Sequence, residues 1–204
     1  MCNVTIITGT GRAGTSFLIG LMTYLGLPTG FTTQEVNETL FYTHAHAGLE
    51  IDPKYDNNQK LLSCTENNYI FKTPRFISTY NWLDALNLKT VIIPIRKDTH
   101  AARSREIQSK FTDRAGGWVE ALSPNSTYKE QLDYNNHHLV NLIWEISKHT
   151  KINTIFMSFP EHVHSSEYSF TKLKEILDEY NIKKHTFVKN HNLLSNKNLI
   201  NYFN

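Results

Sequence analysis

Residues 4–19 read Val-Thr-Ile-Ile-Thr-Gly-Thr-Gly-Arg-Ala-Gly-Thr-Ser-Phe-Leu-Ile, and this stretch decides the fold that the sequence predicts. Its first part, Val4 to Ile7, is β-branched and largely apolar, which is typical of a buried strand. A glycine-rich turn follows over residues 9–14, and an apolar run of helical length then extends from Phe17 to Leu25. Strand, turn and helix in this order predict a phosphate-binding loop, because backbone N–H groups turn inward and the helix N-terminus adds partial positive charge.

The loop departs from the ATP-binding pattern G-x-x-x-x-G-K-[ST] at one informative position. Gly9 and Gly14 keep the spacing of that pattern, but Thr15 stands where the lysine belongs. The cation of the loop is instead Arg12. Ordinary hydrolysis of a nucleoside triphosphate is therefore not the first expectation, because no lysine at this position reaches the β- and γ-phosphates. A glycine-rich turn without any ligand is the alternative interpretation.

A second anion-binding pattern lies in the middle of the chain. An apolar strand is expected over residues 90–96 and ends in Arg96, and a helix is expected to start at Asp98 or Thr99. Ser104 follows Arg96 by eight positions, so both side chains can project into one pocket. A guanidinium and a hydroxyl together suit a phosphate monoester. The alternative is a surface ion pair at Arg96 and a solvated serine.

These two patterns together resemble the PAPS-dependent sulfotransferases, whose donor is 3′-phosphoadenosine 5′-phosphosulfate (PAPS) and whose product is PAP. The loop resembles the part of that family that binds the 5′-phosphosulfate, and Arg96 with Ser104 resembles the part that binds the 3′-phosphate. Lys97-Asp98 departs from the Asp-Pro that the family often has there. The resemblance implies that the donor is bound by Thr10, Gly11, Arg12, Ala13, Gly14, Thr15, Ser16, Phe17, Arg96 and Ser104. Core packing is an equal alternative for Phe17.

The stretch Asn37-Glu38-Thr39-Leu40-Phe41 resembles the Asn-Glu-x-x-Phe segment of the heparan sulfate 3-O-type sulfotransferases. The glutamate of that segment is the catalytic base in the family, so the resemblance implies this role for Glu38. A carboxylate at that point takes the acceptor proton while the acceptor oxygen attacks. Glu35 is the second candidate for the base, and a histidine at position 44 or 46 is the third.

The stretch Phe71-Lys72-Thr73-Pro74 resembles the Lys-[Ser/Thr]-Pro segment at the active site of the same carbohydrate-type enzymes. The resemblance implies that Lys72, together with Arg12, stabilises the charge that develops on the leaving group. It also implies a sugar hydroxyl as the acceptor, with an amine less favoured. Arg75 and residues 116–118 are candidates for acceptor contacts. The late Arg-Lys-Gly loop of the cytosolic members is absent, and its possible replacements are Lys183, Lys184 and Lys189.

The order of the segments predicts one α/β domain over residues 1–204. Strands are expected at residues 4–7, 69–76, 90–96 and 152–159, and helices at residues 17–25, 82–88, 98–110, 130–149 and 169–180. Such alternation is typical of a three-layer parallel sheet with helices on both faces, as in P-loop sulfotransferases and nucleotide kinases. The helix over residues 130–149 is expected to bury Leu132, Leu139, Leu142, Ile143 and Ile146.

The composition limits the partners. The chain has 204 residues, 40% of them hydrophobic, and a formal net charge of +2, which gives no case for binding nucleic acid or a membrane surface. The two cysteines have no metal-ligand spacing, so no metal is expected, and a reduced cytoplasmic setting fits them. No apolar run approaches the roughly 20 residues of a membrane span, and the first strand follows Met1 too closely for a signal peptide.

Three functions are compatible with these patterns. The leading hypothesis is a sulfotransferase that uses PAPS, no metal and a glutamate base. One alternative is a P-loop kinase or NTPase with a displaced lysine, and another is a module that binds PAP without catalysis. The acceptor and the oligomeric state stay open.

Overall fold

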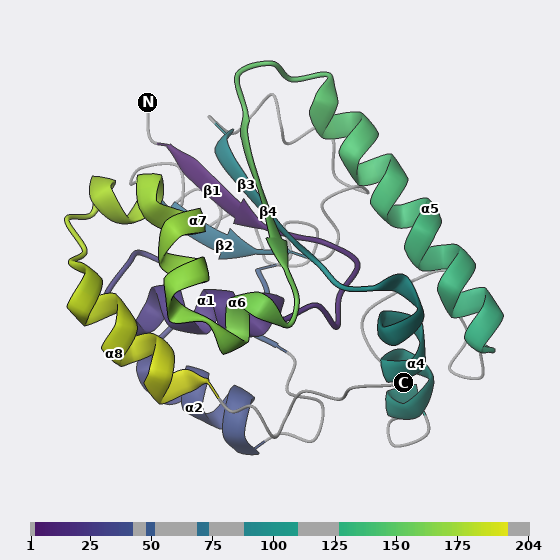
Figure 1. The fold of residues 1–204 in the computed structure, drawn as a ribbon, viewed down its shortest axis with the longest axis horizontal. Coiled ribbons are helices and arrows are strands. Elements are labelled where there is room, and N and C mark those ends of the chain that lie inside the picture. Colours follow the sequence, from purple (N-terminus) through teal and green to yellow (C-terminus); the bar gives the residue numbers. More distant parts are fainter. Residues whose placement is uncertain (1–2, 43–47, 52–68, 74–87, 110–126, 196–204) are drawn as a thin grey trace.

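The structure is a computed structural model that describes residues 3–42, 48–51, 69–73, 88–109 and 127–195 (Figure 1). Its strands are β1 (Val4–Ile7), β2 (Tyr69–Lys72), β3 (Leu88–Ile95) and β4 (Asn153–Ser158). They form one parallel sheet in the order β2-β1-β3-β4. The last residue of β1, Ile7, is level with Lys72 on one side and Ile92 on the other. The segments that follow β1, β2 and β3 therefore meet at one edge of the sheet, where open α/β sheets bind ligands.

The described helices cover both faces of the sheet. They are α1 (Thr15–Tyr24), α2 (Thr33–Tyr42), α4 (Asp98–Ser109), α5 (Tyr128–Ser147), α6 (Glu161–His164), α7 (Ser166–Glu179) and α8 (Lys184–Leu194). One hydrophobic cluster joins Ile7 and Ile92 of the sheet to α1, α7 and α8. A second joins Ile6 and Val91 to Leu142 of α5, on the opposite face (Figure 1). The prediction of an α/β fold with helices on both faces of a parallel sheet is confirmed.

Local signals in the sequence explain several element boundaries. Thr127 caps α5 by accepting a hydrogen bond from the backbone N–H of Glu130, whose carboxylate accepts one from the N–H of Thr127. Such a capping box satisfies two N–H groups that the first helical turn leaves unpaired. Ser165 caps α7 in a similar way by accepting from Tyr168. Helix α8 follows α7 and buries Phe187, His191 and Leu194.

Pro94 is tolerated in the central strand β3 because of where its nitrogen lies. Thr8 donates its N–H to the carbonyl of Ile92, so even-numbered residues of β3 present their backbone groups toward β1. Strand β1 ends at Ile7, before it reaches the level of Pro94. The proline therefore removes no bond from the β1–β3 ladder, which is the usual obstacle to proline in a central strand.

Two predictions of local structure are wrong. Leu88, expected at the end of a helix over residues 82–88, is instead the first residue of β3, and residues 82–87 lie outside the described part of the chain. A short apolar run does not distinguish strand from helix, and here pairing with β1 decides. On α5, Leu142 and Ile146 are buried as expected, whereas Ile143 is 39% exposed, because it lies beside the stripe that the helix turns inward. The buried residues of that stripe are Gln131, Asn135, Leu142 and Ile146.

In the part of the chain that the structure describes, no helix combines the length with the apolar character that crossing a membrane requires.

Substitution of adjacent residues on α5 tests its orientation. We expect Leu142→Ala to lower the free energy of unfolding by about 2–5 kcal/mol, because Leu142 is fully buried and its removal leaves a cavity. Ile143→Ala is the matched control and costs less than about 1 kcal/mol, because that side chain is partly in water. Urea unfolding followed by circular dichroism measures both values. Equal losses would contradict the observed orientation.

Candidate functional site

The loop between β1 and α1 has the backbone that an anion cradle needs. Gly9, Gly11 and Gly14 have φ angles of 147°, 70° and 80°, in the region that favours glycine. Arg12 shares this conformation with φ 55°, although it carries a side chain. Such backbone strain is held in place by surrounding structure and is common at functional sites. Gly14 is the N-cap of α1, so the loop leads directly into the positive end of the helix dipole.

The two anion-binding patterns meet at one place. Arg12 donates from Nε to Oγ of Ser104 over 3.2 Å. Arg96 donates from Nη1 to the backbone carbonyl of Arg12 over 2.9 Å. The structure thus brings together residues 84 and 92 positions apart in the chain. Burial lowers the pKa of Arg12, because desolvation disfavours its charged form.

Arg96 and the start of α4 are held by aromatic and polar neighbours. The guanidinium of Arg96 lies 4.8 Å from the centre of the Phe159 ring, a cation–π contact. Arg96 is 8% exposed and Ser104 is 1% exposed. Asp98 accepts a hydrogen bond from the N–H of Thr99 at the first turn of α4. The alternative interpretation, with Arg96 in a surface ion pair and Ser104 solvated, does not fit this burial.

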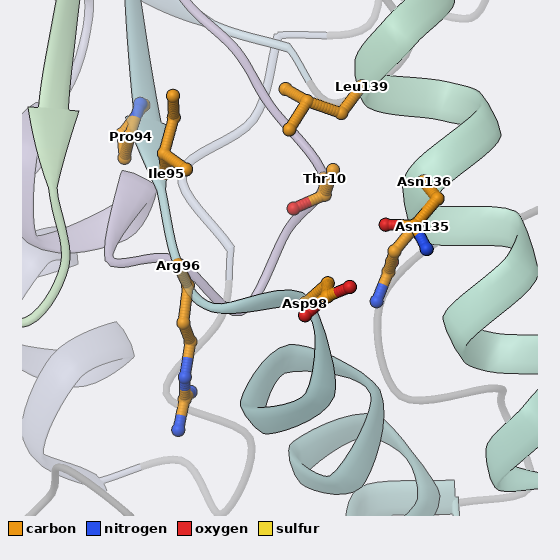
Figure 2. A pocket seen from close by; sticks show the side chains of 8 residues that line it. All are labelled: Thr10, Pro94, Ile95, Arg96, Asp98, Asn135, Asn136 and Leu139. Carbon is orange, nitrogen blue, oxygen red and sulfur yellow. The ribbon is translucent and has the colours of Figure 1, made fainter.

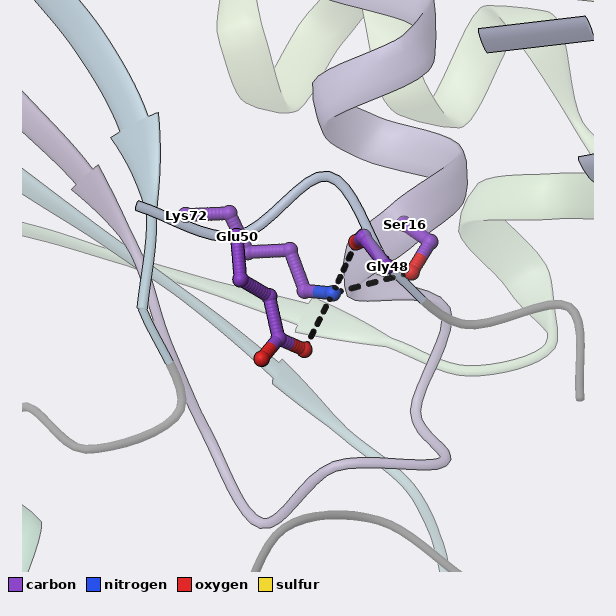
Figure 3. A network of polar contacts seen from close by, with 4 residues as sticks. All are labelled: Ser16, Gly48, Glu50 and Lys72. Atoms are coloured by element: carbon purple, nitrogen blue, oxygen red, sulfur yellow. Dashed lines mark hydrogen bonds and ion pairs between the residues drawn. The ribbon is translucent and has the colours of Figure 1, made fainter. Parts of the chain in front are cut away.

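Lys72 lies at the other end of the loop (Figure 3). Its Nζ donates to Oγ of Ser16 over 3.0 Å, to the carbonyl of Gly48 over 2.6 Å and to the carboxylate of Glu50 over 2.9 Å. Burial lowers the pKa of Lys72, and the ion pair with Glu50 opposes that shift. Because the lysine is 3% exposed, its charge depends on Glu50 in the absence of another anion.

The candidate bases on α2 lie on the protein surface. Glu38 is exposed and accepts a hydrogen bond from Gln34, one helical turn earlier. Glu35 is exposed as well, and its carboxylate accepts hydrogen bonds from the N–H and hydroxyl of Thr32 at the start of α2. Within the described residues, the side-chain contact of Glu38 is to Gln34 and not to the loop. The carboxylate that reaches the loop through Lys72 is that of Glu50.

The remaining loop residues are distributed around this centre. Ala13, Thr15 and Ser16 are buried beneath the loop surface. Thr10 lines a small pocket with Arg96, Asp98 and Asn135 (Figure 2). Phe17 meets His191 edge to face at 5.2 Å between ring centres and belongs to the hydrophobic core. Core packing is therefore what the structure shows for Phe17.

Several predicted site residues contribute nothing to this centre or cannot be placed. Lys184 pairs with Glu167 on the surface of α7 and α8, and Lys183 and Lys189 are exposed. The predictions that fall outside the described residues concern His44, His46, Arg75 and residues 116–118. In the described part of the chain, no three histidine, cysteine or carboxylate side chains are grouped as metal ligands, and the absence of a metal stays a prediction.

Sequence reasoning missed three residues of the site. Glu50 follows no motif, and only the folded chain brings it to Lys72. Arg105, next to Ser104, packs its guanidinium against Gly11, where a Cβ would lie 3.0 Å from Nη2. His162 of α6 packs its ring against Gly14 and donates from Nδ1 to the carbonyl of Ser158 over 3.0 Å. Burial lowers the pKa of His162 to about 4, so the ring is neutral at pH 7.

No protein-family model matches the chain, and no curated protein matches it. The function must therefore be argued from the chemistry of the site.

Two glycines with similar backbone angles test the contact between the loop and His162. Gly14 and Gly26 have φ angles of 80° and 76°, so alanine is strained at both by about 1–2 kcal/mol. At Gly26 a Cβ meets open space, whereas at Gly14 it would overlap the His162 ring. We expect Gly14→Ala to cost about 1–3 kcal/mol more than Gly26→Ala in urea unfolding. If the two variants lose the same stability, the His162 ring does not lie against the loop.

Proposed function

We propose that the protein is a sulfotransferase that moves a sulfuryl group from PAPS to a hydroxyl of a carbohydrate acceptor, with an amine as the less favoured acceptor. The observation that carries this proposal is the convergence of Arg12, Arg96 and Ser104 beside the phosphate-binding loop. A loop and a separate Arg–Ser pair that meet at one sheet edge suit a ligand with two phosphate groups.

Each end of the donor has a proposed partner. The loop residues 10–16 and the N-terminus of α1 bind the 5′-phosphosulfate, because their N–H groups and dipole favour negative charge. Arg96 and Ser104 bind the 3′-phosphate. When the donor binds, the hydroxyl of Ser104 loses its hydrogen bond from the Arg12 guanidinium and contacts phosphate oxygens instead. Arg12 then turns toward the transferred sulfuryl group.

The reaction is an in-line displacement at sulfur. The acceptor oxygen forms a new bond to sulfur while the bond from sulfur to the 5′-phosphate oxygen breaks, and PAP leaves with that oxygen. Arg12 and Lys72 stabilise the negative charge that develops on the leaving phosphate. The proton of the acceptor passes to a carboxylate. No metal takes part, and neither nucleic acid nor a membrane is a proposed partner.

Two carboxylates are proposed for this proton transfer. The resemblance to the 3-O-type sulfotransferases supports Glu38. The geometry supports Glu50, because it lies 2.9 Å from Lys72, which in turn contacts Ser16 of the loop. A general base must reach the acceptor hydroxyl directly or through one water molecule. When the sulfonate of the donor binds Lys72, the carboxylate of Glu50 loses its ion pair and becomes available as a base.

Titration calorimetry with PAP and 5′-AMP tests the donor site. Wild-type protein is expected to bind PAP more tightly than 5′-AMP, because PAP adds the 3′-phosphate. Arg96→Gln lowers the affinity for PAP at least about tenfold and changes that for 5′-AMP little, since a charge-assisted bond to the 3′-phosphate is lost. Arg103→Gln, on the exposed side of α4, is the control and leaves both affinities unchanged. Absence of PAP binding by the wild type would overturn the proposal.

A P-loop kinase or NTPase is a second candidate, and one observation favours it. Ser16 occupies the hydroxyl position of the ATP-binding pattern. Lys72, which lies on strand β2, places its ammonium group 3.0 Å from the Ser16 hydroxyl. This arrangement could replace the lysine missing at Thr15. The same calorimetry with Mg-ATP separates the two candidates, because tight Mg-ATP binding with weak PAP binding is expected only of the kinase or NTPase.

Mass spectrometry of glycan pools incubated with PAPS tests catalysis and the base. We expect the wild type to add sulfate to an acceptor, and Glu38→Gln to lower the rate at least about 100-fold if Glu38 is the base. Glu50→Gln is the paired variant, and loss of rate in that variant alone assigns the role to Glu50. Equal labelling by the wild type and both variants would exclude a carboxylate base at either position. PAP binding without any labelling would identify a module that binds PAP without catalysis.

A further inference from the structure

Helices α4 and α5 bury polar side chains that lack partners. Arg105 of α4 is 3% exposed, and Gln131 and Asn135 of α5 are 1% and 2% exposed. In the described part of the chain, Nε and Nη1 of Arg105 and both amide atoms of Gln131 and of Asn135 have no hydrogen-bond partner. We call these three residues the α4–α5 seam.

The α4–α5 seam adjoins the loop that carries the proposed donor site. The two helices pack against each other and run in opposite directions (Figure 1). Arg105 connects them, because its guanidinium lies 5.9 Å from the centre of the Tyr134 ring and against Gly11 of the loop. Asn135 lines a pocket with Thr10 of the loop, and Figure 2 shows it directed from α5 toward the start of α4.

Leaving these groups unpaired is energetically unfavourable. A buried donor or acceptor without a partner costs about 1–3 kcal/mol, and a charged group costs more. Among the described residues, no carboxylate forms an ion pair with Arg105, and the nearby Arg12 adds repulsion. Burial lowers the pKa of Arg105 to about 10, so the guanidinium stays charged at neutral pH. Buried polar groups in native proteins nearly always have a partner, which is another protein group, ordered water or a bound ion.

We propose that the α4–α5 seam is an oxyanion subsite, in which Arg105 supplies the charge and Gln131 and Asn135 supply neutral hydrogen bonds. A guanidinium matches the geometry of a carboxylate, phosphate or sulfate, and amide N–H groups complete its coordination. The amide oxygens accept from hydroxyl groups of the molecule that carries the oxyanion. This proposal rests on the proposed function for the identity of the nucleotide, but not for the presence of an oxyanion.

The oxyanion can come from either of two molecules. It is the 3′-phosphate of the nucleotide, or it is a carboxylate or sulfate on the acceptor. In the second case the acceptor belongs to the acidic carbohydrates, such as uronic acids or sugars that already carry sulfate. In both cases the oxyanion binds the guanidinium of Arg105. PAP and a free anion compete for that guanidinium only in the first case.

Inorganic sulfate is the probe for the subsite, added at ionic strength matched with sodium chloride. We expect a saturable shift of the Arg105 Nε–H signal in the proton–nitrogen NMR spectrum, assigned by its loss in Arg105→Gln. The same variant is expected to weaken sulfate binding at least about tenfold. Arg103→Gln is the matched control, because it removes an exposed arginine two residues earlier on α4. A sulfate titration that leaves the Arg105 signal in place overturns the proposal, unless PAP moves that signal instead.

Saturation with PAP separates the two sources. If the 3′-phosphate occupies the α4–α5 seam, PAP displaces sulfate, and Arg105→Gln weakens PAP more than 5′-AMP. If the acceptor supplies the oxyanion, the protein saturated with PAP still binds sulfate, and Arg105→Gln leaves the affinity for PAP unchanged. Either result supports the subsite. A wild type that binds sulfate at Arg105 but binds no PAP overturns the proposed function and keeps the subsite.

Apolar variants distinguish a binding role from a structural one. If the amides serve a ligand, Gln131→Leu and Asn135→Leu remove unpaired polar groups, so urea unfolding finds them as stable as the wild type or more stable. Their binding of sulfate is nevertheless weaker. If the amides have a purely structural role, both variants are less stable than the wild type and bind sulfate equally well. That result would overturn the place of the two amides in the subsite.

Discussion

The candidate site depends on positive charge that is buried at the carboxyl edge of a parallel sheet. Arg12, Arg96 and Arg105 lie around one loop, and Lys72 lies at its far end. Each of these cations is largely removed from water, which is unfavourable unless hydrogen bonds or anions compensate. The hydrophobic clusters on both faces of the sheet supply the stability that keeps the cations in place.

The hydrogen bonds and counter-ions that stabilise the buried cations differ between the two ends of the loop. Lys72 has a complete set of partners in the protein, with Glu50 as its counter-ion. Arg105 has no such counter-ion among the described residues, and two of its nitrogen atoms are unpaired. The end of the loop near Lys72 is therefore satisfied without a ligand, whereas the end near Arg105 gains most from an added anion. This asymmetry is a physical reason to expect ligand binding to order and stabilise the junction of the loop with α4 and α5.

Helix α5 departs from the burial pattern that its apolar residues predict. Its apolar residues predict a buried stripe that includes Ile143, but that side chain is partly exposed. The helix instead turns Gln131 and Asn135 inward, toward α4 and the loop. Positions where polar side chains are buried against the sequence pattern are often functional, because a binding site must present polar groups that a hydrophobic core excludes.

The sequence by itself determined the fold class and the glycine-rich turn between β1 and α1, because these follow from local order. β-Branched residues, a glycine-rich turn and apolar runs of helical length act over a few neighbouring residues, and they placed β1, α1 and α5 to within about two or three residues. That Arg96 and Ser104 share one pocket was predicted through a spacing and a family resemblance, whereas the bond from Arg12 to Ser104 comes from the tertiary structure. The pairing of Lys72 with Glu50, the position of Arg105 against Gly11 and the exposure of Glu38 were decided by the tertiary structure alone. These contacts join residues far apart in the chain, or depend on which face of a helix turns inward, and a linear pattern carries no information about either.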